Sequence, residues 1–185
     1  MICNEFKGGI GTASRALKSE AGNYIVGVLV QCNFGRRPNL LIAGVPVGKE
    51  IPEQRAYEPE DGSIIIIVAT DAPLLPQQLK RVAKRAGMGL ARTGSFASNG
   101  SGDIFIAFST ANPEASTQEK VHTVQLLPND ALNPLFEATV QATEEAIVNA
   151  MVAAETMVGA NDRRVIALPH ERLVEVLRKY NRLAK

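Results

Sequence analysis

Residues 58–70 read EPEDGSIIIIVAT, and they mark where the core of the fold begins. The first part of this stretch is acidic and contains Pro and Gly, so we expect it to be solvated and irregular. The β-branched run that follows, Ile64–Val68, predicts a buried strand. Ser63 therefore lies at the mouth of a core strand, directly after Gly62, a residue with no side chain.

Ser63 is a candidate nucleophile that would be activated by cutting the chain in front of it. A serine hydroxyl attacks a carbonyl only when a base lies beside it. A chain-terminal Ser carries that base itself, because its α-amine, with a pKa of roughly 7.7–8.0, is largely available near neutral pH. Gly62 would let the hydroxyl approach the preceding carbonyl, since it has no Cβ. The pair predicts self-cleavage at the Gly62–Ser63 bond, although a plain Asp-Gly turn before a strand is the commoner origin of such a sequence.

Ser101 and Asp103 form a second candidate pair, at the entry of another apolar strand. Their i, i+2 spacing places both side chains on the same side of the chain. A carboxylate can orient a hydroxyl that in turn bonds a nucleophile or its amine. The alternative is a Gly/Ser-rich turn in which Asp103 bonds backbone N–H groups.

Asn33 is a candidate oxyanion donor, because it ends the predicted strand at 24–32. Losing such a donor typically costs about 10²–10³ in rate. An Asn before Phe-Gly is also common in plain turns. Other charged residues are expected on solvated helix faces: Glu144, Glu145, Glu155 and the Arg/Lys cluster at 80–85.

Composition excludes several classes of protein. The chain has 185 residues, of which 45% are hydrophobic and 21% charged, and this predicts one globular domain over 1–185. A formal charge of +1 provides no field for nucleic acid or an anionic membrane. We see no bilayer-spanning run and no signal peptide, so we expect a cytoplasmic protein. Cys3 and Cys32 are too few for a disulfide framework, and two His residues are too few for a metal cluster, so we expect no metal.

Periodicity predicts a mixed α and β fold. The predicted strands are 24–32, 40–47, 63–70 and 103–110, and the predicted helices are 76–92, roughly 133–157 (with a buried stripe of Ile147, Met151, Ala154 and Val158) and roughly 169–180. Glycines at 8, 9 and 11 favour a loop there. The strands at 63–70 and 103–110 are apolar on both faces and need two covering layers. This chain has too few elements for that, which favours a partner chain or a further segment.

Several stretches together resemble the DmpA family, the L-aminopeptidase / D-Ala-esterase/amidase group that includes the β-peptidyl aminopeptidases. They are KGGIGTASR (7–15), VGVLVQCNFG (26–35), DGSIIIIVATDAP (61–73), SGDIF (101–105), and EEAIVNA (144–150) followed by AETM (154–157). They cover nearly the whole chain in the family's order. The chain resembles about the second half of the family's precursor, so the absent first half would be a separate chain, or this chain is a truncated product.

The resemblance implies an α+β fold, an α-β-β-α sandwich of the N-terminal-nucleophile type, here partial. It implies a precursor that cuts itself between Gly and Ser, so that 1–62 resembles the end of the α subunit and 63–185 the β subunit. Ser63 matches the nucleophile, Ser101 the second family serine, Asp103 a position where some members carry Glu, and Asn33 the oxyanion-hole Asn. The family releases N-terminal residues from short peptides, amides or esters, needs no metal or cofactor, and suggests a homotetramer.

Two rival functions follow from the same sequence. The first is a non-catalytic remnant that keeps the fold and acts as an oligomeric structural subunit. The second is acyl transfer to an amine, as in the related ornithine acetyltransferase-like fold, which is expected to use Thr where this chain has Ser63.

Overall fold

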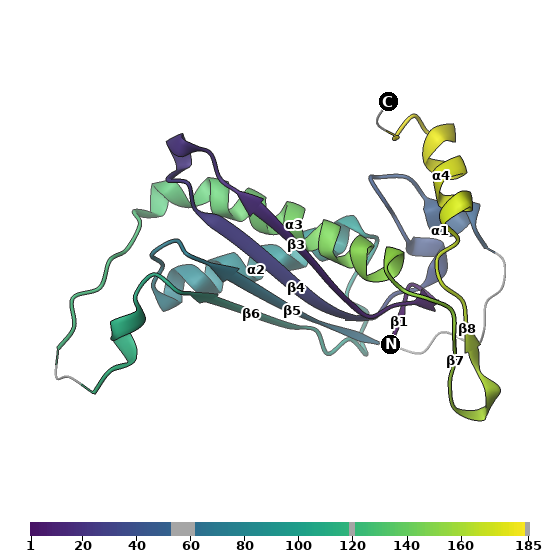
Figure 1. The fold of residues 1–185 in the computed structure, drawn as a ribbon, viewed down its shortest axis with the longest axis horizontal. Coiled ribbons are helices and arrows are strands. Elements are labelled where there is room, and N and C mark those ends of the chain that lie inside the picture. The colour runs from purple at the N-terminus through teal and green to yellow at the C-terminus, as the bar shows by residue number, and fades with distance from the viewer. Residues whose placement is uncertain (53–61, 119–120, 184–185) are drawn as a thin grey trace.

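A four-stranded sheet forms the centre of the protein (Figure 1). The computed structural model describes residues 1–52, 62–118 and 121–183. The strands follow one another across the sheet in chain order: β3 (Ile10–Ala16), β4 (Ile25–Asn33), β5 (Ser63–Thr70) and β6 (Ile104–Ser109). The first three are antiparallel, and β6 runs parallel to β5.

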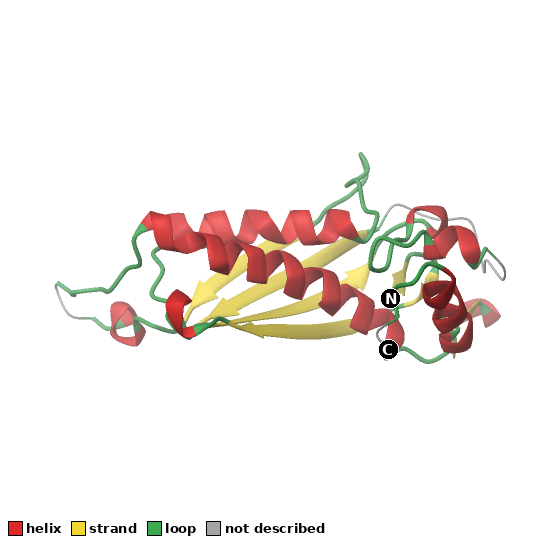
Figure 2. Cartoon of the chain, turned by 90° about the horizontal axis from the view of Figure 1, so that it is seen from above, coloured by secondary structure: helices red, strands yellow, loops and turns green. Residues whose placement is uncertain are grey.

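Two long helices, α2 (Pro76–Arg92) and α3 (Asn133–Val152), cover one face of this sheet (Figure 2). α3 packs on β3 and β4, and α2 packs on β6 and β5. Each helix has a Pro in its first turn, where no N–H partner is needed. The side chains that face the helices alternate along β5, with Ile64, Ile66 and Val68 buried. Their burial against α2 and α3 provides the apolar area that stabilises the fold.

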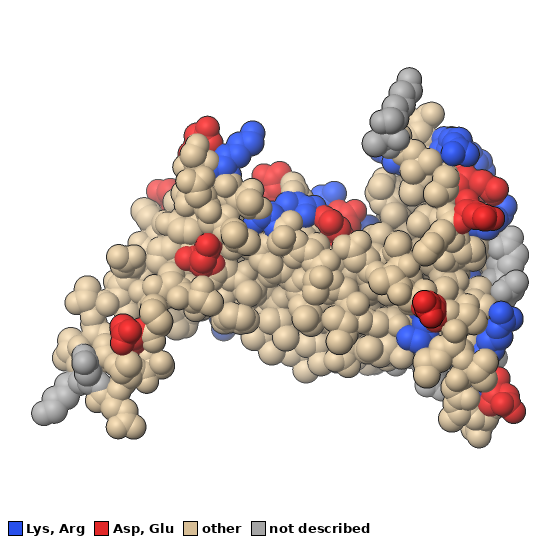
Figure 3. Space-filling model, viewed as in Figure 1, with Lys and Arg blue, Asp and Glu red and all other residues tan. Residues whose placement is uncertain are grey.

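The other face of the sheet is apolar and open. Ile106 and Phe108 of β6 are 47% and 45% exposed, and Ile25 of β4 is 51% exposed. Figure 3 shows few charged side chains over the middle of the molecule on the side drawn there. An exposed apolar face of this extent is unusual for a complete domain. The expectation that the chain has too few layers to cover its core strands on both faces is therefore confirmed.

The partner of β4 differs from the prediction. The predicted strand at 40–47 is wrong, because that segment follows the 3-10 turn Arg37–Asn39 and itself forms only an isolated bridge between Ile42 and Val45. The glycine-rich segment predicted as a loop instead forms β3. The glycine within β3 serves packing, since a Cβ on Gly11 would overlap the carbonyl oxygen of Ala146 in α3.

The second predicted helix, at roughly 133–157, extends too far. α3 ends at Val152, and the chain continues into a hairpin of β7 (Met157–Val158) and β8 (Arg164–Val165). The proposed stripe residue Val158 is 58% exposed, whereas Ile147 and Met151 are buried as expected. The hairpin turn forms because Asn161 and Asp162 adopt left-handed backbone angles, which these residue types tolerate.

Three short elements and the final helix surround one end of the sheet. β1 (Ile2–Cys3) and β2 (Phe6–Lys7) form a small hairpin, and a disulfide joins Cys3 to Cys32 of β4. α4 (His170–Lys179) matches the predicted last helix and packs on α1 (Val47–Glu50).

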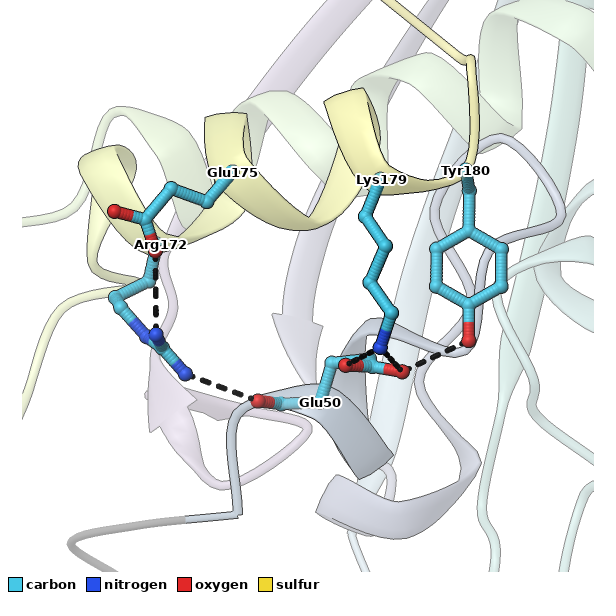
Figure 4. Close-up of polar contacts among 5 residues, drawn as sticks. All are labelled: Glu50, Arg172, Glu175, Lys179 and Tyr180. Carbon is cyan, nitrogen blue, oxygen red and sulfur yellow. Dashed lines mark hydrogen bonds and ion pairs between the residues drawn. The ribbon is translucent and has the colours of Figure 1, made fainter.

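A polar cluster around Glu50 holds α4 against α1 (Figure 4). Lys179 Nζ donates to both Glu50 carboxylate oxygens at 3.0 and 2.9 Å, and the Tyr180 hydroxyl donates to Oε1 at 2.8 Å. The hydrogen bonds from Lys179 and Tyr180 lower the pKa of Glu50, and the bond to Glu50 raises the pKa of Lys179 and that of Tyr180. Arg172 adds a bond to the main-chain carbonyl of Glu50 at 3.4 Å.

Glu50→Gln should therefore lower the Tm by about 1–2 °C between roughly pH 5 and 9. Because the folded pKa of Glu50 is lowered, its contribution is present above its ordinary pKa of about 4.3 and is lost as the pH falls further. Because the folded pKa of Lys179 is raised, its contribution is present below about 10.4 and is lost as the pH rises beyond that. Calorimetry from pH 3 to 10 measures this profile, with Glu155→Gln as the control. A Tm difference that stays constant down to pH 3 would contradict it.

Candidate functional site

Ser63 and Asn33 lie opposite each other where β5 begins and β4 ends. The pairing register places them as direct cross-strand partners, at the end of the ladder that starts with Val26 and Thr70. Neighbouring residues on a strand face opposite sides, so residues two apart share a face. Ser63 shares its face with Ile65 and Ile67 of β5, and Asn33 shares its face with Leu29 and Gln31 of β4. Both side chains therefore lie on the open face of the sheet.

Gly102 provides a main-chain donor to the Ser63 hydroxyl. The N–H of Gly102 donates to Ser63 Oγ with an N···O distance of 2.9 Å. A Cβ on Gly102 would lie 3.2 Å from the same oxygen, closer than most real Cβ contacts. A glycine therefore permits the backbone to approach the hydroxyl. A fixed N–H beside a nucleophilic oxygen can also stabilise negative charge that develops there.

Gly62 is wedged against the backbone that follows β4. A Cβ on Gly62 would overlap the carbonyl oxygen of Asn33 and lie 3.2 Å from the Cα of Phe34. The residue in front of Ser63 must therefore lack a side chain, whatever the chemistry of the site. The acidic residues before it, 58–61, lie outside the described residues.

Asp103 contacts the chain just after Ser63. Its Oδ1 accepts a hydrogen bond from the N–H of Ile64 at 3.1 Å. Sequence reasoning expected this carboxylate to orient the Ser101 hydroxyl, and the hydrogen bond found in its place runs to the main chain of β5. The Ser101 N–H donates to Ser98 O at 2.8 Å within a tight turn. The turn expected as the alternative for this segment is thus present. It places the Asp103 carboxylate in contact with Ile64, the residue that follows Ser63.

Cavities lie on both sides of the Gly62–Ser63 bond. One, of about 450 Å³, is lined by Asn33 and Gly62 together with the β7–β8 hairpin; we call it the Asn33 cavity. Another, of about 420 Å³, is lined by Ser101 and Asp103 together with α2. A small hollow of about 30 Å³ lies between them and is lined by both Gly62 and Ser101. Asn33, Ser101 and Asp103 therefore line neighbouring hollows, and Ser63 is linked to them through its pairing with Asn33 and the bond that it accepts from Gly102.

Sequence reasoning missed two parts of this region. The Gly102 N–H carries no side-chain signal, and only its glycine, between Ser101 and Asp103, hints at a close backbone approach. The β7–β8 hairpin was predicted as the end of a helix, so its contribution to the Asn33 cavity was not foreseen. The predicted surface role of two glutamates holds, since Glu145 pairs with Arg15 at 2.6 Å and Glu144 with Arg92 at 2.5 Å.

The described part of the chain holds neither a group of metal ligands nor a helix fit to span a membrane. Within residues 1–52, 62–118 and 121–183, no three His, Cys, Asp or Glu side chains are grouped as metal ligands would be. The helices of those ranges include none with the length and apolar character of a membrane span.

Comparison with known proteins places this geometry in a family. The model of Peptidase family S58 matches residues 1–165. The beta-peptidyl aminopeptidase BapA of Sphingosinicella microcystinivorans is 53% identical over 100% of this chain. Among solved structures, a Burkholderia sp. beta-aminopeptidase has a TM-score of 0.86 at 46% identity over 97% of this chain. The L-aminopeptidase D-Ala-esterase/amidase of Ochrobactrum anthropi, whose structure is described as a variant of the Ntn hydrolase fold, has a TM-score of 0.90 at 47% identity over 100% of this chain.

The match does not extend to the full length of these relatives. This chain spans 50% of BapA, 51% of the Burkholderia protein and 51% of the Ochrobactrum protein. The likeness is close enough in sequence and in structure to show both the fold and the family. The chain is an α+β protein that belongs to Peptidase family S58, the DmpA group of aminopeptidases.

Proposed function

We propose that this chain is the part of a serine aminopeptidase or amidase that cuts its own Gly62–Ser63 bond and uses Ser63 as the nucleophile. The observation that carries the proposal is the position of Ser63: it begins β5, its hydroxyl accepts the Gly102 N–H, and Asn33 lies opposite. A serine that was merely a turn residue would need none of these neighbours. The clustering of all four predicted residues weighs against a non-catalytic remnant.

In the proposed cycle, the hydroxyl of Ser63 attacks the carbonyl of Gly62 and later that of the substrate. The first attack moves the Gly62 acyl group from the Ser63 nitrogen to its oxygen, and water hydrolyses the resulting ester, which leaves a Gly62 carboxylate and a free Ser63 α-amine. In the later attack on the substrate, this amine takes the hydroxyl proton and returns it to the leaving amine. Asn33 and the Gly102 N–H are the donors for the oxyanion. Asp103 holds Ile64, and with it the start of β5, in line, and Ser101 would hold the freed amine. Water then hydrolyses the acyl-enzyme, and no step requires a metal.

We further propose that a second polypeptide half covers the open face and completes the substrate pocket. Ser63 and Asn33 lie on that face, so whatever covers its apolar residues also covers them. The chain spans about half of its relatives, which leaves a half of matching size to supply the cover. Substrates would be short peptides, amides or esters, including β-amino acid derivatives, and the assembly would be a homo-oligomer, a tetramer by family resemblance.

Ser63→Ala should abolish self-cleavage, because both the nucleophile and the later base depend on this residue. Intact-mass measurement of freshly made protein should give two pieces, 1–62 and 63–185, for the parent chain and one for the variant. Ser95→Ala, in the neighbouring loop, is the control and should cleave like the parent. Two fragments from the Ser63→Ala chain would remove the proposal.

Gly62→Ala should slow self-cleavage at least 10-fold, because the new Cβ displaces the scissile carbonyl from Ser63. The matched control is Gly27→Ala, at the far end of the same strand pair, where the nearest atom to a Cβ would be 4.0 Å away. Gel time courses of both variants give the rates. Equal rates for Gly62→Ala and Gly27→Ala would show that the close approach at Gly62 has no part in the reaction.

Turnover of β-alanyl p-nitroanilide should require the covering half. We expect it when this chain is co-expressed with the half of the Burkholderia beta-aminopeptidase that it does not match, and not from this chain alone. Ile106→Asp on the open face should prevent that assembly, because it buries an unpaired charge. Self-cleaved protein that assembles but shows no turnover would refute the proposed activity.

A further inference from the structure

The β1–β2 hairpin contacts the end of β4 that carries Asn33. Asn4 and Glu5 both have positive φ angles, 49° and 62°, as a two-residue type I′ hairpin turn requires. The disulfide between Cys3 and Cys32 fastens this hairpin to β4 one residue before Asn33. Both cysteines are fully buried, so the cross-link lies inside the fold.

The hairpin also fixes which way the Asn33 amide faces. The N–H of Ile2 donates to Asn33 Oδ1 at 2.9 Å. A main-chain N–H can bond only an acceptor, so this contact assigns the oxygen of the amide to the hairpin side. The NH₂ group, with its two N–H donors, then faces away from the hairpin. Asn33 and Gly62 line the same cavity, so the Asn33 amide and a carbonyl at the position of Gly62 belong to one region of the surface.

Other bonds keep the hairpin folded without the cross-link. Asn4 N–H donates to Phe34 O at 2.7 Å, and Cys32 N–H donates to Gly9 O at 2.9 Å. The buried guanidinium of Arg37 donates to the carbonyl of Asn4 at 3.1 Å and to that of Glu5 at 2.6 Å. Opening the disulfide should therefore change local spacing and leave the fold in place.

Local spacing at this point has little room to adjust. After reduction, the two sulfur atoms are no longer bonded and must move apart to van der Waals distance. Gly8 is packed so closely on Cys3 that a Cβ there would lie 2.6 Å from Cys3 Cβ. Cys3 therefore has little room on the Gly8 side, and we expect the separation of the two sulfur atoms to displace β1 from β4. The Ile2–Asn33 bond is the contact that such a movement breaks.

We propose that the Cys3–Cys32 disulfide is a positioning element for the Asn33 amide, so that reduction weakens the oxyanion donor at the site. The step is thiol–disulfide exchange with a dithiol reductant, which supplies two electrons and two protons, leaves two thiols in the protein and itself becomes a cyclic disulfide. This inference rests on the proposed function, because it assigns Asn33 a part in the reaction. Cys3 and Cys32 act through Asn33 and touch no reacting atom.

The rate of self-cleavage tests the catalytic part. Chain made by cell-free synthesis with oxidised glutathione should cleave about 10-fold faster than chain made with dithiothreitol. Alkylation followed by mass spectrometry confirms the state of the two cysteines. Cys3→Ala/Cys32→Ala should cleave slowly under both conditions. Val28→Ala, a buried change elsewhere on β4, should lose stability yet keep the dependence on dithiothreitol.

Nuclear magnetic resonance tests the positioning part without catalysis. In uncut Ser63→Ala protein, the side-chain amide signals of Asn33, assigned by their loss in Asn33→Asp, should shift when dithiothreitol is added. Those of Asn149, whose amide donates to Thr12 O at 2.9 Å, should not. Asn33 signals that do not move in protein with both thiols alkylated would overturn the inference. So would cleavage rates of the oxidised and the reduced chain that lie within two-fold of each other. If no condition yields cleavage, the proposed function fails, and the Asn33 signals still decide whether the cross-link positions the amide.

Discussion

The antiparallel pairing of β4 with β5 is the constraint from which the site follows. Its register runs from Val26–Thr70 to Asn33–Ser63, and a slip by one residue would turn every side chain of a strand to the other face. The alternation of buried and exposed positions along both strands prevents such a slip. Ser63 and Asn33 therefore face each other because the residues deeper in the strands are buried under α2 and α3. The same burial that stabilises the sheet sets the geometry of the proposed chemistry.

This arrangement also explains how the chain could be cut without coming apart. β3 and β4 precede the Gly62–Ser63 bond, and β5 and β6 follow it, yet all four strands share one sheet. A break in front of β5 would leave the β4–β5 ladder and the helices on it intact. The proposed cut thus frees an amine at the mouth of a strand at little cost to the core. An end made elsewhere, inside a strand, would lose pairing and burial.

Much of the fold was predictable because the segments with the clearest hydrophobic patterns in the sequence form the helices and strands of the core. α2 matches its prediction at both ends, and the apolar run Ile64–Val68 forms β5 as expected. β3 was missed because its glycine, Gly11, serves close packing on α3, which no local pattern reveals. The strand predicted at 40–47 was wrong because apolar residues can fill the core from an irregular segment as well as from a strand. The buried residues of this segment are Leu40, Ile42, Val45 and Val47. At the site, residue types alone suggested Ser63, Asn33, Ser101 and Asp103, but the donor role of the Gly102 main chain depends on tertiary approach and has no counterpart in composition.

The open face of the sheet carries both exposed apolar side chains and the proposed site residues. Ile65 and Ile67 continue the face on which Ser63 lies, and Leu29 continues that of Asn33. Water in contact with this face also reaches the hydroxyl and the amide, and a polar reaction centre in bulk water gains little from fixed donors. A covering layer would remove water from both at once. The apolar burial that would drive such an assembly would thereby also create the low-dielectric surroundings in which Asn33 and the Gly102 N–H act most strongly. The proposed nucleophile and donors are then already in place in this chain, while the strength of those donors would depend on the covering layer.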